Sequence, residues 1–163
     1  MSRRFPAARA ATASEALSVL LAAQQVLAEA EEPSDLLFWR VANELVPADD
    51  LWWPAFNRHL GARAWSDAAA SLVGKVLPGW RLVLDFGEAG GADLYDNVPD
   101  GDWAFTRSYE EGDAAPGLAA LRALAAALVD DAADAQKREI VACEAKKRDE
   151  IAAGEAEPEQ EKP

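Results

Sequence analysis

Helical spacing of apolar residues marks the first element of the chain. From Ala13 to about Glu31, leucines and alanines recur three and four positions apart, which predicts an amphipathic helix. Thr12 and Glu15 form a capping box that places the start of this helix. Pro33 places its end, because the residue before a proline is pushed out of the α region.

A second helix is predicted to begin at Ser34, which is a favourable N-cap residue. Its apolar stripe runs to Leu45 and Val46, and Pro47 closes it. Trp39 widens that stripe, so we expect this helix to be buried over much of its girth.

The segment 48–65 shows no clear period and is predicted to be irregular. Its large rings are Trp52, Trp53, Phe56 and Trp65. The favoured interpretation is that these rings cover one edge of the core, because each contributes a large apolar area. The alternative is an exposed patch for a partner protein, since aromatic residues are enriched at interfaces.

The rest of the chain is organised around a unit between Trp65 and Asp130. Ser66 is the expected N-cap of a helix that Pro78 stops. The hydrophobic period then becomes that of strands, predicted at 82–86 and 92–95 with a third strand at 103–109 as an option, before a leucine-rich helix from Pro116. This pattern predicts an α+β fold, in which helices pack a small antiparallel sheet of two or three strands in the order α-β-β-β-α.

One domain with a charged extension is the expected organisation. We predict a disordered N-terminus at 1–12, a single α+β domain at 13–130 with a helical annex at 13–46 and a sandwich core at 65–130, and a charged helix and disordered tail at 131–163. Acidic residues precede basic ones by four positions in the extension, which favours a helix that protrudes and frays near its end.

Charge narrows the classes of partner. The chain has 16 Lys and Arg against 29 Asp and Glu, for a net charge of −13, and the acidity is concentrated in the strand region and the tail. This balance opposes binding to nucleic acid or to an anionic membrane surface. No apolar run approaches the roughly 20 residues of a transmembrane helix. The N-terminus superficially imitates a signal peptide, but Glu15, Gln24 and Gln25 favour a cytoplasmic amphipathic helix instead.

Few residues offer catalytic chemistry. With one His and one Cys, the chain cannot form a disulfide framework or a zinc site of several thiolates or imidazoles. His59 lacks a nucleophile elbow, and we expect it at the surface or the core edge. No charge pattern singles out Cys143 as an activated thiolate on the C-terminal helix. The sequence therefore predicts no catalytic residue, no cofactor and no metal ligand.

The alternative to a chain without metal ligands is a cation site formed by carboxylates in the predicted turns. Asp93, Asp96, Asp100 and Asp102 lie close together in sequence, and a divalent cation prefers such oxygen ligands. Their spacing does not match a calcium loop, and aspartates are common in turns. The segment Gly87–Gly91 indicates a hairpin turn, because it lacks the Gly-Lys-Ser/Thr of a phosphate loop and a strand follows it. The candidate partner surface comprises Trp52, Trp53, Asp96, Asp100 and Asp102.

The α-β-β-β-α order is also that of double-stranded RNA-binding domains. Those domains need basic residues on their second helix and in a strand-connecting loop to reach phosphates. Here the corresponding helix, APGLAALRALAAALVDD, carries Arg122 as its one basic residue, and the hairpins are acidic. The topology is compatible with that class, but RNA binding is not expected.

Three segments together resemble a family of small phage and prophage proteins, the phage ABA sandwich domain. They are the helix from Pro33 to Leu45, the run Ser66–Val73 with Leu77-Pro78-Gly79-Trp80 after it, and the Ala- and Leu-rich helix from Ala114 to Val129. The resemblance covers roughly residues 33–130. It implies a helix–sheet–helix sandwich encoded in a phage-like region of a bacterial genome, and it implies no catalytic residues.

Three functions follow as hypotheses. The first is a phage or prophage accessory protein that acts through protein–protein contacts without catalysis, in the bacterial cytoplasm or in the phage particle. The second is an acidic mimic of nucleic acid that blocks a host DNA-binding defence protein. The third is a metal-dependent enzyme that uses the carboxylates between Asp93 and Asp102.

Overall fold

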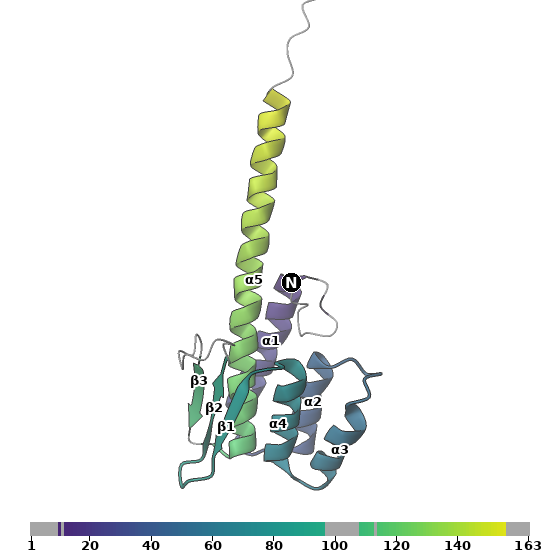
Figure 1. Cartoon of the computed structure of the whole chain (residues 1–163), viewed down its shortest axis with the longest axis vertical. Helices are drawn as coiled ribbons and strands as arrows, with labels where there is room; N and C mark the ends of the chain where they lie inside the picture. Colours follow the sequence, from purple (N-terminus) through teal and green to yellow (C-terminus); the bar gives the residue numbers. More distant parts are fainter. Residues whose placement is uncertain (1–9, 11, 97–107, 113, 156–163) are drawn as a thin grey trace, which may run out of the picture.

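The computed structural model describes residues 10, 12–96, 108–112 and 114–155 (Figure 1). Its elements are α1 (Ala13–Glu29), α2 (Asp35–Leu45), α3 (Trp53–Gly61), α4 (Trp65–Val76), β1 (Arg81–Asp85), β2 (Gly91–Tyr95), β3 (Ser108–Gly112) and α5 (Pro116–Glu155). The three strands form one antiparallel sheet in the order β1-β2-β3, and helices pack against it. The predicted α+β class is therefore confirmed, including the third strand.

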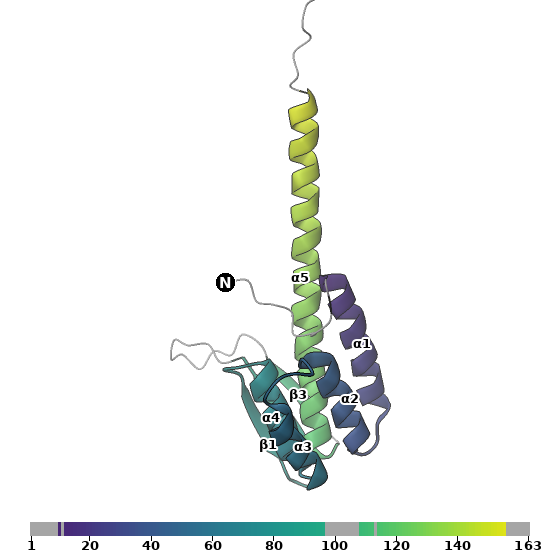
Figure 2. The ribbon, with the colours of Figure 1, turned by 90° about the vertical axis from the view of Figure 1, so that its right-hand side faces the viewer.

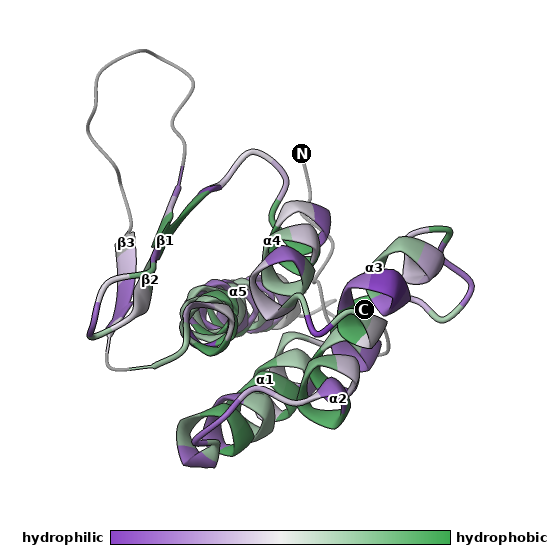
Figure 3. Cartoon of the chain, turned by 90° about the horizontal axis from the view of Figure 1, so that it is seen from below, coloured by the Kyte–Doolittle hydropathy of each residue, from purple (hydrophilic) through white to green (hydrophobic). Residues whose placement is uncertain are grey.

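The N-terminal half of α5 is the centre of the fold. Seen from below, it lies between the sheet on one side and α1 on the other, with α4 beside it (Figure 3). Leucines and alanines of this half, among them Leu118, Leu121, Leu124 and Leu128, are fully buried. α1 runs alongside α5 in Figure 2, and α2 and α3 lie farther out. The leucine-rich helix thus supplies the surface on which α1, α4 and the sheet pack.

Alternation in the strands directs one face of the sheet towards α5. Leu82 and Leu84 of β1 are half-buried against the core, whereas Arg81, Val83 and Asp85 are exposed. On β2, Ala92 and Leu94 are buried. On β3, the Tyr109 hydroxyl donates a 2.7 Å hydrogen bond to Asp130 of α5. Within the described residues no helix covers the other face, so the sheet is open on that side (Figure 3).

The first two helices begin at the capping residues that the sequence predicts. The Thr12 hydroxyl accepts a hydrogen bond from the backbone N–H of Glu15 at 3.2 Å, and Ser34 accepts one from the N–H of Leu37 at 3.3 Å. Each bond satisfies one N–H group that an unfinished first turn would leave unpaired. These two residues therefore determine where α1 and α2 begin.

Several sequence-based boundaries were wrong. Residues 53–61 are not irregular but form α3, which begins next to Pro54 and buries Phe56 and Leu60. α4 begins at Trp65 and has no side-chain cap, so Ser66 lies inside the helix instead of capping it. The third strand is described at 108–112 and ends three residues later than predicted, while the predicted start at 103–107 lies outside the described part of the chain.

Less of the surface of α2 is buried than predicted. Leu37, Phe38 and Val41 are buried, but Trp39 is 48% exposed and Leu36 is 74% exposed. The reason is position: α2 lies at the outside of the fold and contacts its neighbours along one side (Figure 3). A helix at that place buries a single stripe.

Arg122 of α5 binds the C-terminal end of α1. Its guanidinium donates hydrogen bonds from Nε to the carbonyl of Leu27 at 3.1 Å and from a terminal nitrogen to the carbonyl of Ala30 at 2.9 Å. Carbonyls at the end of a helix have no partner within that helix and carry its partial negative charge. The single basic residue of the buried part of α5 thus caps the C-terminus of α1.

Candidate functional site

The tryptophans of the candidate partner surface are anchored within the fold. The indole N–H of Trp52 donates a 2.8 Å hydrogen bond to the Ser71 hydroxyl, and that of Trp53 donates a 2.7 Å bond to the carbonyl of Pro47. The Trp52 ring stacks on the buried ring of Phe56 at a centroid distance of 4.3 Å. Both indoles are half-buried and packed against the core, which agrees with the interpretation favoured from the sequence.

The acidic residues of that surface lie elsewhere. Asp96 follows the C-terminal end of β2, the central strand, whereas Trp52 and Trp53 are at α3, on the far side of α4 and α5 (Figure 3). Asp100 and Asp102 lie outside the described residues. The structure therefore does not bring the tryptophans and Asp96 together into one surface.

Other candidates for chemistry are dispersed. Across the described ranges, no three His, Cys, Asp or Glu side chains are grouped closely enough to hold a metal ion. His59 is half-buried on α3, and Cys143 is an exposed free thiol on α5. The Gly87–Gly91 segment is the predicted hairpin turn: the N–H of Gly87 is bound by the Asp85 carboxylate at 2.8 Å, and β2 returns antiparallel to β1.

The open face of the sheet is acidic at its centre. Asp93 of β2 lies directly opposite Glu110 of β3, so two like charges are neighbours across the strands. Beside them, desolvation together with the charge of Asp93 raises the pKa of the Tyr95 hydroxyl. An acidic pair of this kind would attract a basic partner.

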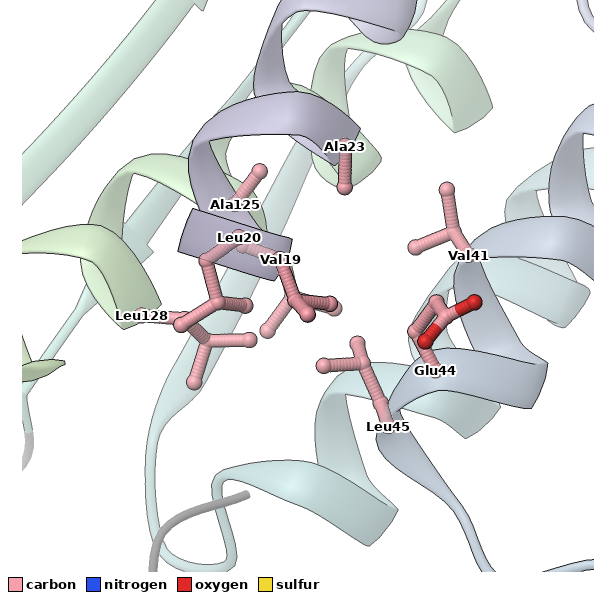
Figure 4. Close-up of a pocket in the computed structure, with 9 residues that line it drawn as sticks. Val19, Leu20, Ala23, Val41, Glu44, Leu45, Ala125 and Leu128 are labelled. Atoms are coloured by element: carbon pink, nitrogen blue, oxygen red, sulfur yellow. The ribbon is translucent and has the colours of Figure 1, made fainter. Parts of the chain in front are cut away.

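An apolar notch lies between α1, α2 and α5 (Figure 4). Its lining residues are Val19, Leu20, Ala23, Val41, Glu44, Leu45, Leu124, Ala125 and Leu128. Its cavity volume is about 10 Å³, roughly the room that one water molecule needs. A pocket for a drug-sized ligand measures about 300–1,000 Å³ and offers several convergent polar groups. Glu44 is the one polar residue here, so the notch has the character of a packing gap.

The most conspicuous surface is the second half of α5. Beyond Ala135 the helix leaves the body and continues as a single rod to Glu155 (Figures 1 and 2). Every residue from 137 to 151 is exposed. Among them Ile140, Val141 and Ile151 are 52%, 64% and 62% exposed. The sequence predicted a protruding helix but gave these apolar residues no role. The available signal was the recurrence of Ile at 140 and 151 after the leucine stripe had ended.

Salt bridges along the rod stabilise it locally. The Lys137 ammonium lies 3.6 Å from the Asp134 carboxylate, and Lys146 lies 3.7 Å from Glu150. Exposed pairs of this kind contribute a few tenths of a kcal/mol each. Such pairs support a helix but do not bury its apolar side chains, which stay available for contact.

No described helix is both long and apolar enough to cross a membrane.

Comparisons with known proteins add nothing to the geometry of these surfaces. No protein family, curated protein or solved structure compared with the chain matches it.

Proposed function

We propose that the protein is a non-catalytic accessory protein that works by binding another protein, with the projecting part of α5 as its contact element. The observation that carries this proposal is the exposure of residues 137–151, which hold three large apolar side chains away from the body. The expected partner offers a groove for one helix, a mode in which a few apolar anchors on one face supply the affinity.

The anchors of that helix are defined by its geometry. Ile140 and Ile151 are eleven residues apart, which is close to three helical turns, so their side chains lie on the same face. Val141 is one residue along and points about 100° away from Ile140. We therefore assign binding to the Ile140–Ile151 face and treat Val141 as lying outside it.

Charge indicates the character of the groove. The segment 137–151 contains five basic residues (Lys137, Arg138, Lys146, Lys147, Arg148) and four acidic ones (Glu139, Glu144, Asp149, Glu150). Its net charge is thus +1 in a chain whose net charge is −13. The three consecutive basic residues near Ile151 favour a groove with an acidic rim at that end.

The origin of the protein is part of the proposal. The resemblance of residues 33–130 to the phage ABA sandwich domain supports a phage or prophage gene. The protein would then meet its partner in the cytoplasm of a bacterial host or in the phage particle. A helix that projects from a folded body suits either place, because it can enter a groove without rearrangement of the body.

Site-specific photocrosslinking tests the contact element. A photoreactive residue at position 140 should capture one defined partner in host cells, and that partner, once purified, should bind the full chain. Ile140→Glu with Ile151→Glu should weaken this binding at least tenfold, while the control Val141→Glu should leave it within about twofold. The helix is exposed at all three positions, so circular dichroism should stay unchanged. Equal loss in all three variants, or no loss in the double variant, would reject the assignment.

A second function is favoured by the acidic pair on the open face of the sheet. Asp93 opposite Glu110 gives a concentrated negative charge, as a protein that imitates nucleic acid would need. Such a mimic should inhibit a basic nuclease, and its affinity should fall as salt rises. Asp93→Asn with Glu110→Gln should reduce inhibition, whereas removal of residues 137–163 should not. Inhibition that ignores both salt and these substitutions would contradict mimicry.

A further inference from the structure

The sheet ends in an unpaired strand on the side of β1. The strand order β1-β2-β3 makes β1 and β3 the two edges. Within the described residues, β1 pairs with β2 alone. Figure 3 shows α4 in the helical layer beside α5, not in line with the sheet beyond β1. The outer N–H and C=O groups of β1 are therefore available for another strand.

The two edges differ in how they discourage pairing. Charged side chains commonly blunt an exposed edge. β3 carries Glu110, Glu111 and Gly112 in its five residues. β1 is Arg81-Leu82-Val83-Leu84-Asp85, with an apolar centre and one charge at each end. Val83 is 38% exposed and is the middle residue of the strand.

We propose that β1 is an interface for a second copy of this chain, which pairs with it edge to edge in antiparallel orientation about Val83. In this register Val83 faces the partner's Val83 across a two-fold axis. Arg81 lies opposite the partner's Asp85, and Asp85 lies opposite the partner's Arg81. The strand is complementary to itself, as the symmetric interface of a two-fold dimer requires.

Other registers lose this match. A slip of one residue would put the exposed residues of one strand opposite the core-facing residues of the other, so that the apolar faces of the two sheets would point to opposite sides. A slip of two residues leaves Arg81 and Asp85 without opposite charges. The centred register instead sets Leu82 opposite the partner's Leu84 on the core-facing side. These leucines are half-buried in the single chain, and the joined six-stranded sheet covers them further.

The second copy is favoured over an unrelated peptide by this charge pattern. An unrelated strand would need an acid and a base at matching positions, whereas a copy of β1 supplies both. Asp85 is exposed and binds the Gly87 N–H through one carboxylate oxygen, so its second oxygen can face the partner's Arg81.

Charge reversal in the full chain tests the interface. Light scattering after size exclusion should give a dimer for the natural chain over a range of concentrations. Arg81→Glu should weaken the dimer at least about tenfold, because an acid then opposes an acid at both symmetric positions. Asp85→Lys should do the same with bases. An equimolar mixture of the two variants should recover a heterodimer, since each chain then offers the charge that the other lacks.

Further variants separate this interface from other surfaces. Val83→Lys places two cations face to face and should also abolish the dimer, while Glu110→Lys on the opposite edge should not. A chain ending at Gln136 lacks the projecting helix and should remain dimeric, so the inference does not depend on the function proposed for α5. Circular dichroism confirms that each variant folds. A natural chain that is monomeric at every concentration, or a dimer indifferent to Arg81→Glu and Val83→Lys, overturns the proposal.

Discussion

Substitution of Gly117 by alanine should destabilise the protein, against the usual effect of that change in a helix. Gly117 is in the first turn of α5, where the start of α4 crosses it. A Cβ atom added there would lie 2.8 Å from the backbone carbon and the Cβ of Trp65 and 2.9 Å from its carbonyl oxygen. These atoms belong to the backbone and to the root of a side chain, so they cannot rotate away. α4 itself would have to move.

The size of the effect follows from two opposing contributions. Replacing a helical glycine by alanine typically stabilises a protein by up to about 1 kcal/mol. Forcing an extra carbon into a well-packed site typically costs about 1–3 kcal/mol. Contacts near 2.8 Å put Gly117→Ala in the upper part of that range. We therefore expect a net loss of about 1–2 kcal/mol in the free energy of unfolding.

Gly74 supplies a matched control in α4. A Cβ at Gly74 would have nothing within 4 Å, so Gly74→Ala should stabilise the protein by about 1 kcal/mol. For a chain of this size, the two variants should differ in Tm by about 5–10 °C, with opposite signs relative to the natural chain. Urea unfolding monitored by tryptophan fluorescence measures both. If Gly117→Ala stabilises as much as Gly74→Ala, the close crossing of α4 and α5 is wrong.

Three smaller predictions concern single contacts. Arg122→Met keeps the aliphatic stem but removes both hydrogen bonds to the end of α1, and should lower the free energy of unfolding by about 2 kcal/mol, with Arg122→Lys intermediate in the same urea assay. Ser71→Ala removes the hydroxyl that accepts the hydrogen bond from the Trp52 indole, which should cost about 1 kcal/mol, and this cost should largely vanish in a chain that already carries Trp52→Phe. The Lys75 ammonium, and then the backbone N–H of Trp52, hold the pKa of Asp50 below its ordinary value. The folded state therefore loses stability as pH falls below about 4, and Asp50→Asn should make that loss shallower in urea midpoints measured against pH.

The part of the fold that the sequence predicted is the part that local signals determine. Thr12 and Ser34 act within three residues of themselves, so α1 and α2 begin where capping predicts. The change of period after Pro78 likewise located β1 and β2, because alternation needs no knowledge of distant residues.

The misplaced elements depend on contacts between distant parts of the chain. α3 was missed because its tryptophans give no helical period, and the bond from Trp52 to Ser71, nineteen residues away, holds it against α4. β3 extends to Gly112, beyond its predicted end at Tyr109, because its extent is set by pairing with β2, in which Gly91 lies opposite Gly112. Neither contact leaves a pattern in the local sequence.

Prediction of the candidate site was limited for a similar reason. The tryptophans stood out as large rings, but sequence alone cannot show that both indole N–H groups are bound within the fold. The projecting helix was expected from its charges. The significance of Ile140 and Ile151 emerged from the absence of a packing partner in the described body, which is a property of the whole arrangement. The role of Arg122 at the end of α1 was equally invisible, because the two are more than ninety residues apart.

The continuity of α5 sets a fixed distance between the body and the end of the projecting helix. The same helix that forms the centre of the body runs on without a break to Glu155. From residue 137 to residue 151 it spans about 20 Å at a rise of about 1.5 Å per residue. A Gly- and Ser-rich connector of equal length would allow any separation up to its reach. Cargo held at the end of this rod would instead be kept at a fixed distance and direction from the body, and inserting or deleting whole helical turns would reset that distance in known steps.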